Sequence, residues 1–146
     1  MGDFIGAFAL VRRSGRYLMV QNERVIGGVP QRVWDLPGGR VEAGELLHEA
    51  VRRELDEETG LAVTSTPQLA FVQEGERVLG GDRRYAWRSF FFSVEVEGEP
   101  RAASEVLDVR WMTQAEVEAE CTAPYHDSFR AWLTSGGVHF LSAWRD

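Results

Sequence analysis

The chain has 146 residues, of which 16 are basic and 23 are acidic, so its formal net charge is −7. This length predicts a single domain spanning 1–146, and the 44% hydrophobic and 27% charged content is typical of a globular protein. No apolar run approaches the ~18 residues that a membrane span requires, so we expect no membrane partner. Because phosphates must be met by clustered cations, the acidic balance also argues against a nucleic-acid polymer as partner.

The cysteine content and the N-terminal residues indicate the cellular compartment in which the protein is expected. The single cysteine, Cys121, excludes an internal disulfide and has no adjacent base to activate it, so we expect it to be structural. The first residues lack a basic segment followed by a long apolar one, and a signal peptide is therefore not expected. The expected location is cytoplasmic, as a monomer or a homodimer.

In chain order, the first half predicts strands, a loop and one strong helix. Residues 4–11 and 17–20 form an apolar hairpin, 21–33 resemble a loop, and 33–36 form a short apolar piece before Pro37-Gly38-Gly39. Residues 45–59 are rich in Ala, Leu, Glu and Arg and predict a helix that Gly60 ends.

The second half predicts further strands and two short helices. We expect strands at 61–63, 69–73, 85–96 and 106–112, with a polar turn at 75–84. Thr113 and Glu116 form a capping-box pattern for a helix that runs to about Glu120. A last helix presents Tyr125, Phe129, Trp132 and Leu133 on one face and ends at Gly136-Gly137. This order predicts an α/β (α+β) fold in which helices pack on a mixed sheet.

The predicted helix 45–59 carries three glutamates on one face. With about 100° per residue, Glu54, Glu57 and Glu58 continue the apolar stripe of the helix. The solvated face falls instead on His48, Arg52 and Asp56. Like charges at these spacings repel, and turning them inward costs more unless a cation lies among them.

A hard divalent cation would resolve this repulsion, since Mg²⁺ and Mn²⁺ prefer carboxylate oxygens. The preceding Gly38 and Gly39 allow the backbone to approach a ligand closely, so that a carbonyl there could add another oxygen. The alternative interpretation is a charged helix end neutralised by Arg52 and Arg53, without a metal.

Taken together, this segment resembles the Nudix hydrolase family, whose box is G-x5-E-x7-R-E-U-x-E-E-x-G-U with U aliphatic. Every position of the box, which spans residues 39–61, has its match in this chain: Gly39, Glu45, Arg53, Glu54, Leu55, Glu57, Glu58, Gly60 and Leu61. The resemblance implies a Nudix-type α/β/α sandwich with a mixed β-sheet between helices. It also implies an enzyme that hydrolyses a phosphoanhydride in a nucleoside diphosphate linked to another group, with nucleoside triphosphates as possible substrates and Mg²⁺ or Mn²⁺ as cofactor.

The resemblance also implies roles for individual residues. Glu54, Glu57 and Glu58 would hold the metal, with the Gly38 carbonyl and a loop glutamate, Glu105, as further ligands. Arg53 would orient the carboxylates through charge-assisted hydrogen bonds, and either Glu54 or Glu105 would take the proton of the attacking water.

The substrate is less well defined by the sequence. Four arginines flank the expected cleft and could reach phosphates: Arg24, Arg32, Arg83 and Arg84. Trp34 could stack on a base, as could Tyr85 and Trp87. The proline of ADP-ribose members is replaced by Glu76, and the tyrosine of dinucleoside-polyphosphate members by Val78. The alternative function is a non-catalytic Nudix-fold module that senses a nucleotide, although such modules usually lose box glutamates.

Overall fold

The computed structural model describes residues 2–145 and contains ten strands, three α-helices and one 3-10 helix in that range. In chain order, the elements are β1 (Phe4–Arg13), β2 (Arg16–Ile26), β3 (Val29–Asp35), β4 (Gly38–Arg40), α1 (Leu47–Thr59), β5 (Ala62–Val63), β6 (Gln68–Leu79), β7 (Asp82–Val94), β8 (Val96–Glu97), β9 (Asp108–Met112), α2 (Gln114–Glu120), η1 (Pro124–His126), α3 (Asp127–Ser135) and β10 (His139–Arg145).

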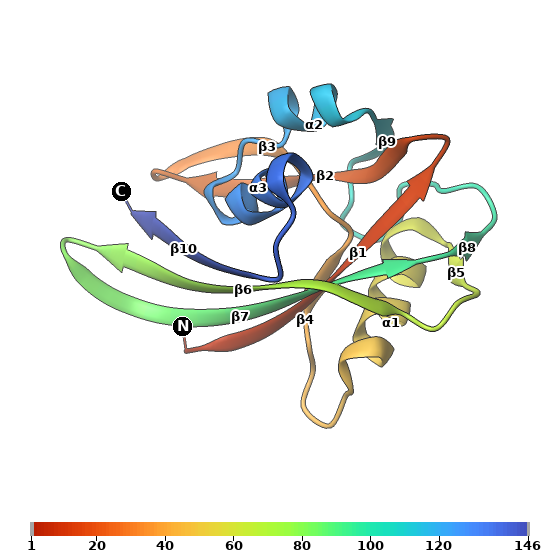
Figure 1. Cartoon of the computed structure of the whole chain (residues 1–146). Helices are drawn as coiled ribbons and strands as arrows, with labels where there is room; N and C mark the ends of the chain where they lie inside the picture. The colour runs from red at the N-terminus through yellow and green to blue at the C-terminus, as the bar shows by residue number, and fades with distance from the viewer. Residues whose placement is uncertain (1, 146) are drawn as a thin grey trace.

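Eight of the strands form one mixed sheet. Its order is β10-β6-β7-β1-β2-β3, with β4 paired to β1 and β9 paired to β2. The pairs β1–β7 and β10–β6 are parallel, whereas the other pairs are antiparallel. Strands β5 and β8 form a separate two-stranded ribbon. Figure 1 shows α1 on one side of the sheet and α2, η1 and α3 on the other.

Each face of the sheet has its own hydrophobic core. Ala50, Val51 and Leu55 of α1 pack against small and branched residues of β1 and β7. On the opposite face, Phe129 of α3 joins a cluster that includes Phe71 and other side chains of β1, β2, β6, β7 and α2. These two cores confirm the predicted sandwich.

Helix α1 begins two residues later than its pattern predicts and ends where it predicts. The carboxylate of Glu49 accepts a hydrogen bond from the backbone N–H of Leu46 at 2.8 Å and so caps the first turn. At the other end, Gly60 adopts a φ of 73°, the left-handed conformation that favours glycine after a helix. The Thr113–Glu116 capping box of α2 is also confirmed.

Two predicted loops are in fact long hairpins. Strand β2 continues to Ile26 and β3 begins at Val29, so only a Gly27-Gly28 turn remains of the loop expected at 21–33. Likewise β6 and β7 extend through most of 75–84 and turn at Gly80-Gly81. Both hairpins project from the edge of the packed core, so their strands carry polar side chains. Because of these polar residues, the sequence pattern resembles that of a loop and does not predict the strands.

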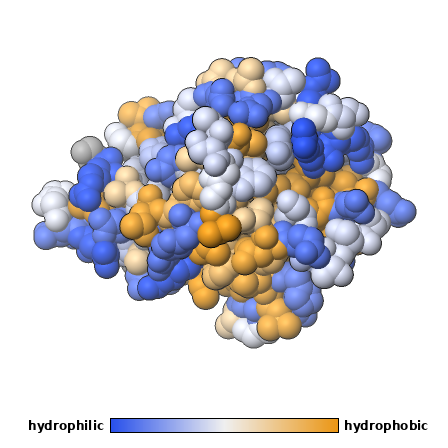
Figure 2. Space-filling view, in the orientation of Figure 1, coloured by the Kyte–Doolittle hydropathy of each residue, from blue (hydrophilic) through white to orange (hydrophobic). Residues whose placement is uncertain are grey.

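The C-terminal strand β10 was not predicted. It alternates exposed and covered residues and pairs in parallel with β6 as an edge strand. Side chains on the face shown in Figure 2 are mixed in character, with hydrophobic ones gathered over the middle of the sheet and hydrophilic ones toward both ends. None of the helices within residues 2–145 is both long enough and apolar enough to cross a membrane.

Candidate active site

A polar cavity of about 250 Å³ lies beside the C-terminal half of α1, and we call it the carboxylate cavity. It brings together all five residues predicted as metal ligands, from three separate segments. Its lining includes Gly38, Glu54, Glu57, Glu58 and Glu105, together with Asn22, Arg24, Ser104 and Val106. Residues far apart in the sequence thus place four carboxylates around one space.

The loop that precedes α1 is joined directly to the helix. The backbone N–H of Gly38 donates a 2.7 Å hydrogen bond to Oε1 of Glu58. A Cβ on Gly38 would lie 2.3 Å from the carbonyl oxygen of Ala7, and one on Gly39 would lie 2.9 Å from Oε1 of Glu54. Gly38 is therefore needed because β4 runs too close to the backbone of β1 to leave room for a side chain, whereas a Cβ on Gly39 would meet only the end of the Glu54 side chain.

Glu105 enters the cavity because its loop is pinned to the end of α1. The backbone N–H of Ala103 donates to the carbonyl of Glu58 at 3.0 Å, and that of Arg101 donates to the carbonyl of Thr59 at 3.0 Å. These two bonds satisfy carbonyls that the helix end leaves unpaired. They also hold the loop so that Glu105 faces the carboxylates of the box.

Arg53 organises the acidic residues around it. Its Nε and one terminal nitrogen donate to the two oxygens of Glu45 at 2.7 and 3.0 Å. Its other terminal nitrogen lies 2.9 Å from Glu54 and 3.3 Å from Glu57. The same guanidinium reaches the carbonyl of Arg40 at 3.1 Å. Arg53 thus orients two carboxylates of the cavity and ties the loop 40–45 to α1.

The electrostatics of the cavity differ from those at its margin. Burial raises the pKa of Glu58 to about 8, although the hydrogen bond from Gly38 opposes this shift. Burial also raises the pKa of Glu54, against the stabilising effect of Arg53. Outside the cavity, the hydrogen bond from Arg53 lowers the pKa of Glu45 to about 2. The cavity therefore holds acidic groups whose charge is incompletely compensated.

This donor set fits a divalent cation. Four carboxylates share the cavity, and no ion pair of Glu58 with a cation occurs within residues 2–145. In the present side-chain conformations, no three acidic, His or Cys residues of that range already stand at coordinating distance from one point. Oxygen ligands of this kind are the ones that Mg²⁺ and Mn²⁺ prefer.

A second cavity, of about 480 Å³, adjoins the first and is lined by aromatic side chains. We call it the aromatic cavity, and its six rings are Phe4, Phe8, Tyr85, Trp87, Tyr125 and Trp144. Trp87 is fixed because its indole N–H donates to Gln73 at 2.8 Å, and the Gln73 amide donates in turn to Ser128 at 2.8 Å. Arg24 lines both cavities, so its side chain marks their boundary.

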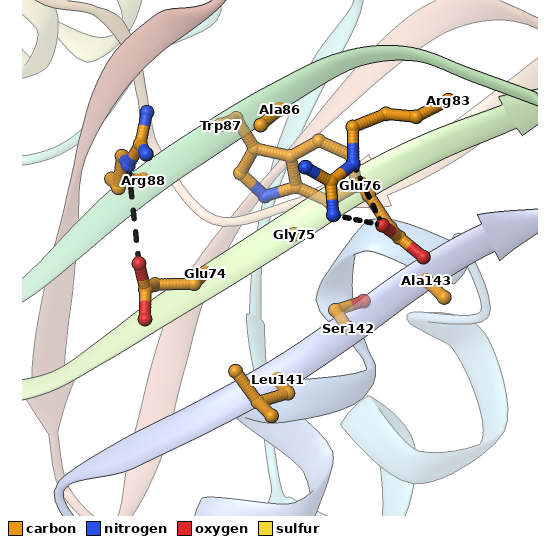
Figure 3. A pocket seen from close by; sticks show the side chains of 10 residues that line it. All are labelled: Glu74, Gly75, Glu76, Arg83, Ala86, Trp87, Arg88, Leu141, Ser142 and Ala143. Atoms are coloured by element: carbon orange, nitrogen blue, oxygen red, sulfur yellow. Dashed lines mark hydrogen bonds and ion pairs between the residues drawn. The ribbon is translucent and has the colours of Figure 1, made fainter.

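A third cavity, of about 410 Å³, lies where β6, β7 and β10 run side by side. Figure 3 shows Arg83 directed at Glu76 and Arg88 facing Glu74 across it. The first pair is 2.6 Å apart and the second 3.9 Å. Since its charges are paired with each other and none of its residues belongs to the box, we assign it no chemistry.

The predicted substrate residues have different positions. Arg24 lies between the two cavities, and Tyr85 and Trp87 line the aromatic one. Arg32 and Arg84 line none of the three cavities described above. Trp34 is only 5% exposed and packs in the core. Asn22, which lines the carboxylate cavity, and Tyr125, which lines the aromatic one, were not predicted as site residues, because their positions depend on tertiary contacts.

The comparison with known proteins decides the family. The model of the NUDIX domain matches residues 3–133 of this chain. The chain belongs to the Nudix family. An uncharacterized Nudix hydrolase of Salmonella typhi, YfcD, is 28% identical over 82% of this chain and 64% of its own length. Nudix hydrolase 7 of Arabidopsis thaliana is 32% identical over 74% of this chain and 38% of its own length.

The fold of this Nudix chain is also that of a solved structure. The MutT protein of Bacillus halodurans superimposes with a TM-score of 0.77 over 97% of this chain and 89% of that one, at 24% identity. The chain spans less than two thirds of the length of the curated relatives described above. The structural likeness therefore establishes the fold and the family model establishes the family, and the activity has to be argued from the site.

Proposed function

We propose that this Nudix protein is a hydrolase that depends on Mg²⁺ or Mn²⁺ and cleaves a phosphoanhydride bond in a nucleoside diphosphate linked to another group. One observation carries the proposal: the carboxylate cavity opens beside an aromatic cavity, and Arg24 lies at their boundary. A substrate with a planar base and a diphosphate would match an aromatic cavity that is followed by an arginine and then by a cluster of carboxylates. The base would stack on aromatic rings, and the diphosphate would extend past Arg24 toward the glutamates.

In this proposal the box residues hold the cation. Glu54, Glu57 and Glu58 would supply carboxylate oxygens, and Gly38 and Glu105 lie where they could add further ligands. When bound, the cation neutralises phosphoryl oxygens and lowers the pKa of water. Arg53 acts through Glu54 and Glu57, because it fixes the direction of their carboxylates.

The proposed chemical step is an attack by water on phosphorus. The water oxygen forms a bond to phosphorus, the bond from phosphorus to the bridging oxygen breaks, and that oxygen leaves on the second phosphate. The proton of the water passes to a carboxylate oxygen of Glu54 or Glu105, both of which line the cavity. The electrons of the broken bond stay on the leaving phosphate, so the step needs no other reactant.

The proposed partner is therefore a small nucleotide derivative. The unpaired Cys121 is fully buried, and burial raises the pKa of its thiol to about 12, which fits a reduced, unreactive residue in the cytoplasm. A nucleotide-sensing module is the competing function. It leaves unexplained why every box carboxylate is present and why Glu54, Glu57 and Glu58 line one cavity.

A panel of substrates separates these functions. The purified chain would be incubated with nucleoside triphosphates, nucleotide sugars, ADP-ribose and dinucleoside polyphosphates, with Mg²⁺ or Mn²⁺ and in EDTA. We expect turnover of at least one class, with loss of activity in EDTA. Tight binding of a nucleotide without hydrolysis under any condition would favour the sensing module, and full turnover in EDTA would exclude the proposed mechanism.

A further inference from the structure

A buried carboxylate outside the box connects the two cavities. Asp35 is 2% exposed and stands at the end of β3, three positions before Gly38. Its Oδ2 accepts a 3.0 Å hydrogen bond from Asn22, and its Oδ1 accepts a 2.8 Å bond from the hydroxyl of Tyr125. The imidazole Nε2 of His126 lies 3.1 Å from Oδ1.

Arg24 is the remaining partner of this carboxylate. Its terminal nitrogen lies 3.5 Å from Oδ2 of Asp35. Arg24 follows Asn22 by two positions on β2, so both side chains project from the same face of that strand. The Arg24 side chain is 47% exposed, whereas that of Asp35 is 3% exposed. This ion pair and a 3.4 Å hydrogen bond from the Arg24 guanidinium to the carbonyl of Glu23 hold a long side chain that is otherwise half open to solvent.

Without this anchor, Arg24 would have other carboxylates within the space that it lines. The carboxylate cavity contains Glu54, Glu57 and Glu58, and Arg53 pairs with only the first two. A guanidinium and a carboxylate attract each other strongly in a partly buried space. A freed Arg24 would therefore move toward Glu58 and occupy the region that the cation needs.

We propose that Asp35 is a positioning residue that holds Arg24 at the boundary between the cavities and keeps its guanidinium out of the carboxylate cluster. This inference rests on the proposed metal site. It explains why an arginine can lie beside that site without neutralising it. It also explains why the same arginine remains available to a diphosphate that reaches across the boundary.

The test measures the affinity of the whole chain for Mn²⁺, by electron paramagnetic resonance of the free ion. We expect Asp35→Asn to weaken Mn²⁺ binding about tenfold, and Arg24→Gln to leave it within about twofold or to strengthen it. The double variant Asp35→Asn/Arg24→Gln should bind Mn²⁺ as tightly as Arg24→Gln alone, because the cation that Asp35 restrains is gone. A matched control, Asp35→Asn/Arg16→Gln, restores the same net charge at an exposed residue of β2 and should bind as weakly as Asp35→Asn.

Two results would overturn the inference. One is a double variant with Arg24→Gln that binds Mn²⁺ as weakly as Asp35→Asn alone. The other is an equal rescue by Arg16→Gln, which would mean that only net charge matters. Circular dichroism verifies that each variant is folded.

A second measurement uses nuclear magnetic resonance and applies even if Asp35→Asn does not fold. The terminal guanidinium N–H groups of Arg24, one nitrogen of which lies 3.5 Å from Asp35, are assigned with Arg24→Lys at low temperature. They should exchange with water at the same rate in the metal-free chain and in excess Mg²⁺. Acceleration by Mg²⁺ would mean that Arg24 pairs with the metal ligands, contrary to the proposal. If the unsubstituted chain binds no Mn²⁺, the metal site itself fails. In that case the contact between Asp35 and Arg24 is tested alone, by the exchange rate of the Arg24 N–H groups in Asp35→Asn, or in Asp35→Glu if Asp35→Asn is unfolded. Faster exchange supports the role of Asp35 in positioning Arg24, and an unchanged rate refutes it.

Discussion

The carboxylate of Glu58 accepts a hydrogen bond from the backbone N–H of Gly38 at 2.7 Å, across 20 positions of the chain. This bond joins the last turn of α1 to the loop that enters β4. The carboxylate is thereby directed at the cavity, although burial opposes its ionisation. The same contact links the stability of the metal-free chain to the proposed chemistry.

The first prediction follows from that link and concerns pH. Glu58 has a folded pKa of about 8 against an ordinary value of 4.5, so its contribution to stability is fully present below pH 4.5 and is lost as pH rises to 8. In EDTA, the free energy of unfolding in urea should therefore decrease across this range, and Glu58→Gln should remove that part of the slope. Parallel pH profiles for the two chains would contradict the prediction.

The Glu58→Gln variant should also lose several orders of magnitude in kcat, since it lacks one of the carboxylates proposed to bind the cation.

The second prediction concerns Gly38, whose φ is 148°. Gly38→Ala should lower the free energy of unfolding by about 2–4 kcal/mol, because its Cβ would meet the carbonyl of Ala7. Gly44→Ala is the matched control, since Gly44 has a φ of 82° but no atom within 4 Å of the position that a Cβ would take. The control should cost only about 1 kcal/mol of backbone strain. Equal losses in urea unfolding would mean that the close approach of β4 to β1 is unimportant.

The third prediction concerns the different roles of two neighbouring arginines, Arg52 and Arg53, in activity. Arg53→Lys should reduce kcat about 100-fold, because one ammonium cannot replace the bonds that the guanidinium makes to Glu45, Glu54 and Glu57. Arg52 lies on the outer face of α1 and donates to backbone carbonyls instead. Arg52→Lys should retain activity in the same steady-state assay. A similar loss for both variants would point to general damage to the helix.

The fourth prediction tests Glu105. If it binds the cation or accepts the proton, Glu105→Gln should lower kcat far more than it changes KM, because the residue acts on the attacking water. Glu99→Gln is the control, since Glu99 is exposed and pairs with Arg13 away from the cavity. If Glu105→Gln turns over substrate as fast as the unsubstituted chain at saturating metal, the prediction fails and the role of proton acceptor is assigned to Glu54.

The orientation of the box residues on α1 and the order of strands and helices could be predicted from the sequence because both depend on local spacing. The phase of α1 places Glu54 and Glu58 on one side and His48, Arg52 and Asp56 on the other, and the structure has the last three exposed. Helical geometry alone fixes these relations. The spacing therefore sufficed to predict the partly buried positions of Glu54 and Glu58, whereas Glu57, also expected to face inward, is exposed at the rim of the cavity.

Other features could not be predicted because they depend on distant partners. Gly75 reads as a turn residue, yet it lies inside β6, where the indole of Trp87 occupies the space of a side chain and a Cβ would be 2.1 Å from that ring. Asp35 meets Tyr125 across 90 positions of the chain. No periodicity within one segment reports contacts of this kind.

The central claim is that the carboxylate cavity is a metal-dependent hydrolytic centre, and anomalous X-ray diffraction tests it most directly. Crystals of the chain would be grown with Mn²⁺ at a concentration that supports turnover. We predict an anomalous peak inside the cavity, with oxygens of Glu54, Glu57 and Glu58 at about 2.0–2.6 Å, the range for hard cations. Full activity in solution with the peak absent from this cavity, or located only elsewhere on the molecule, would contradict it.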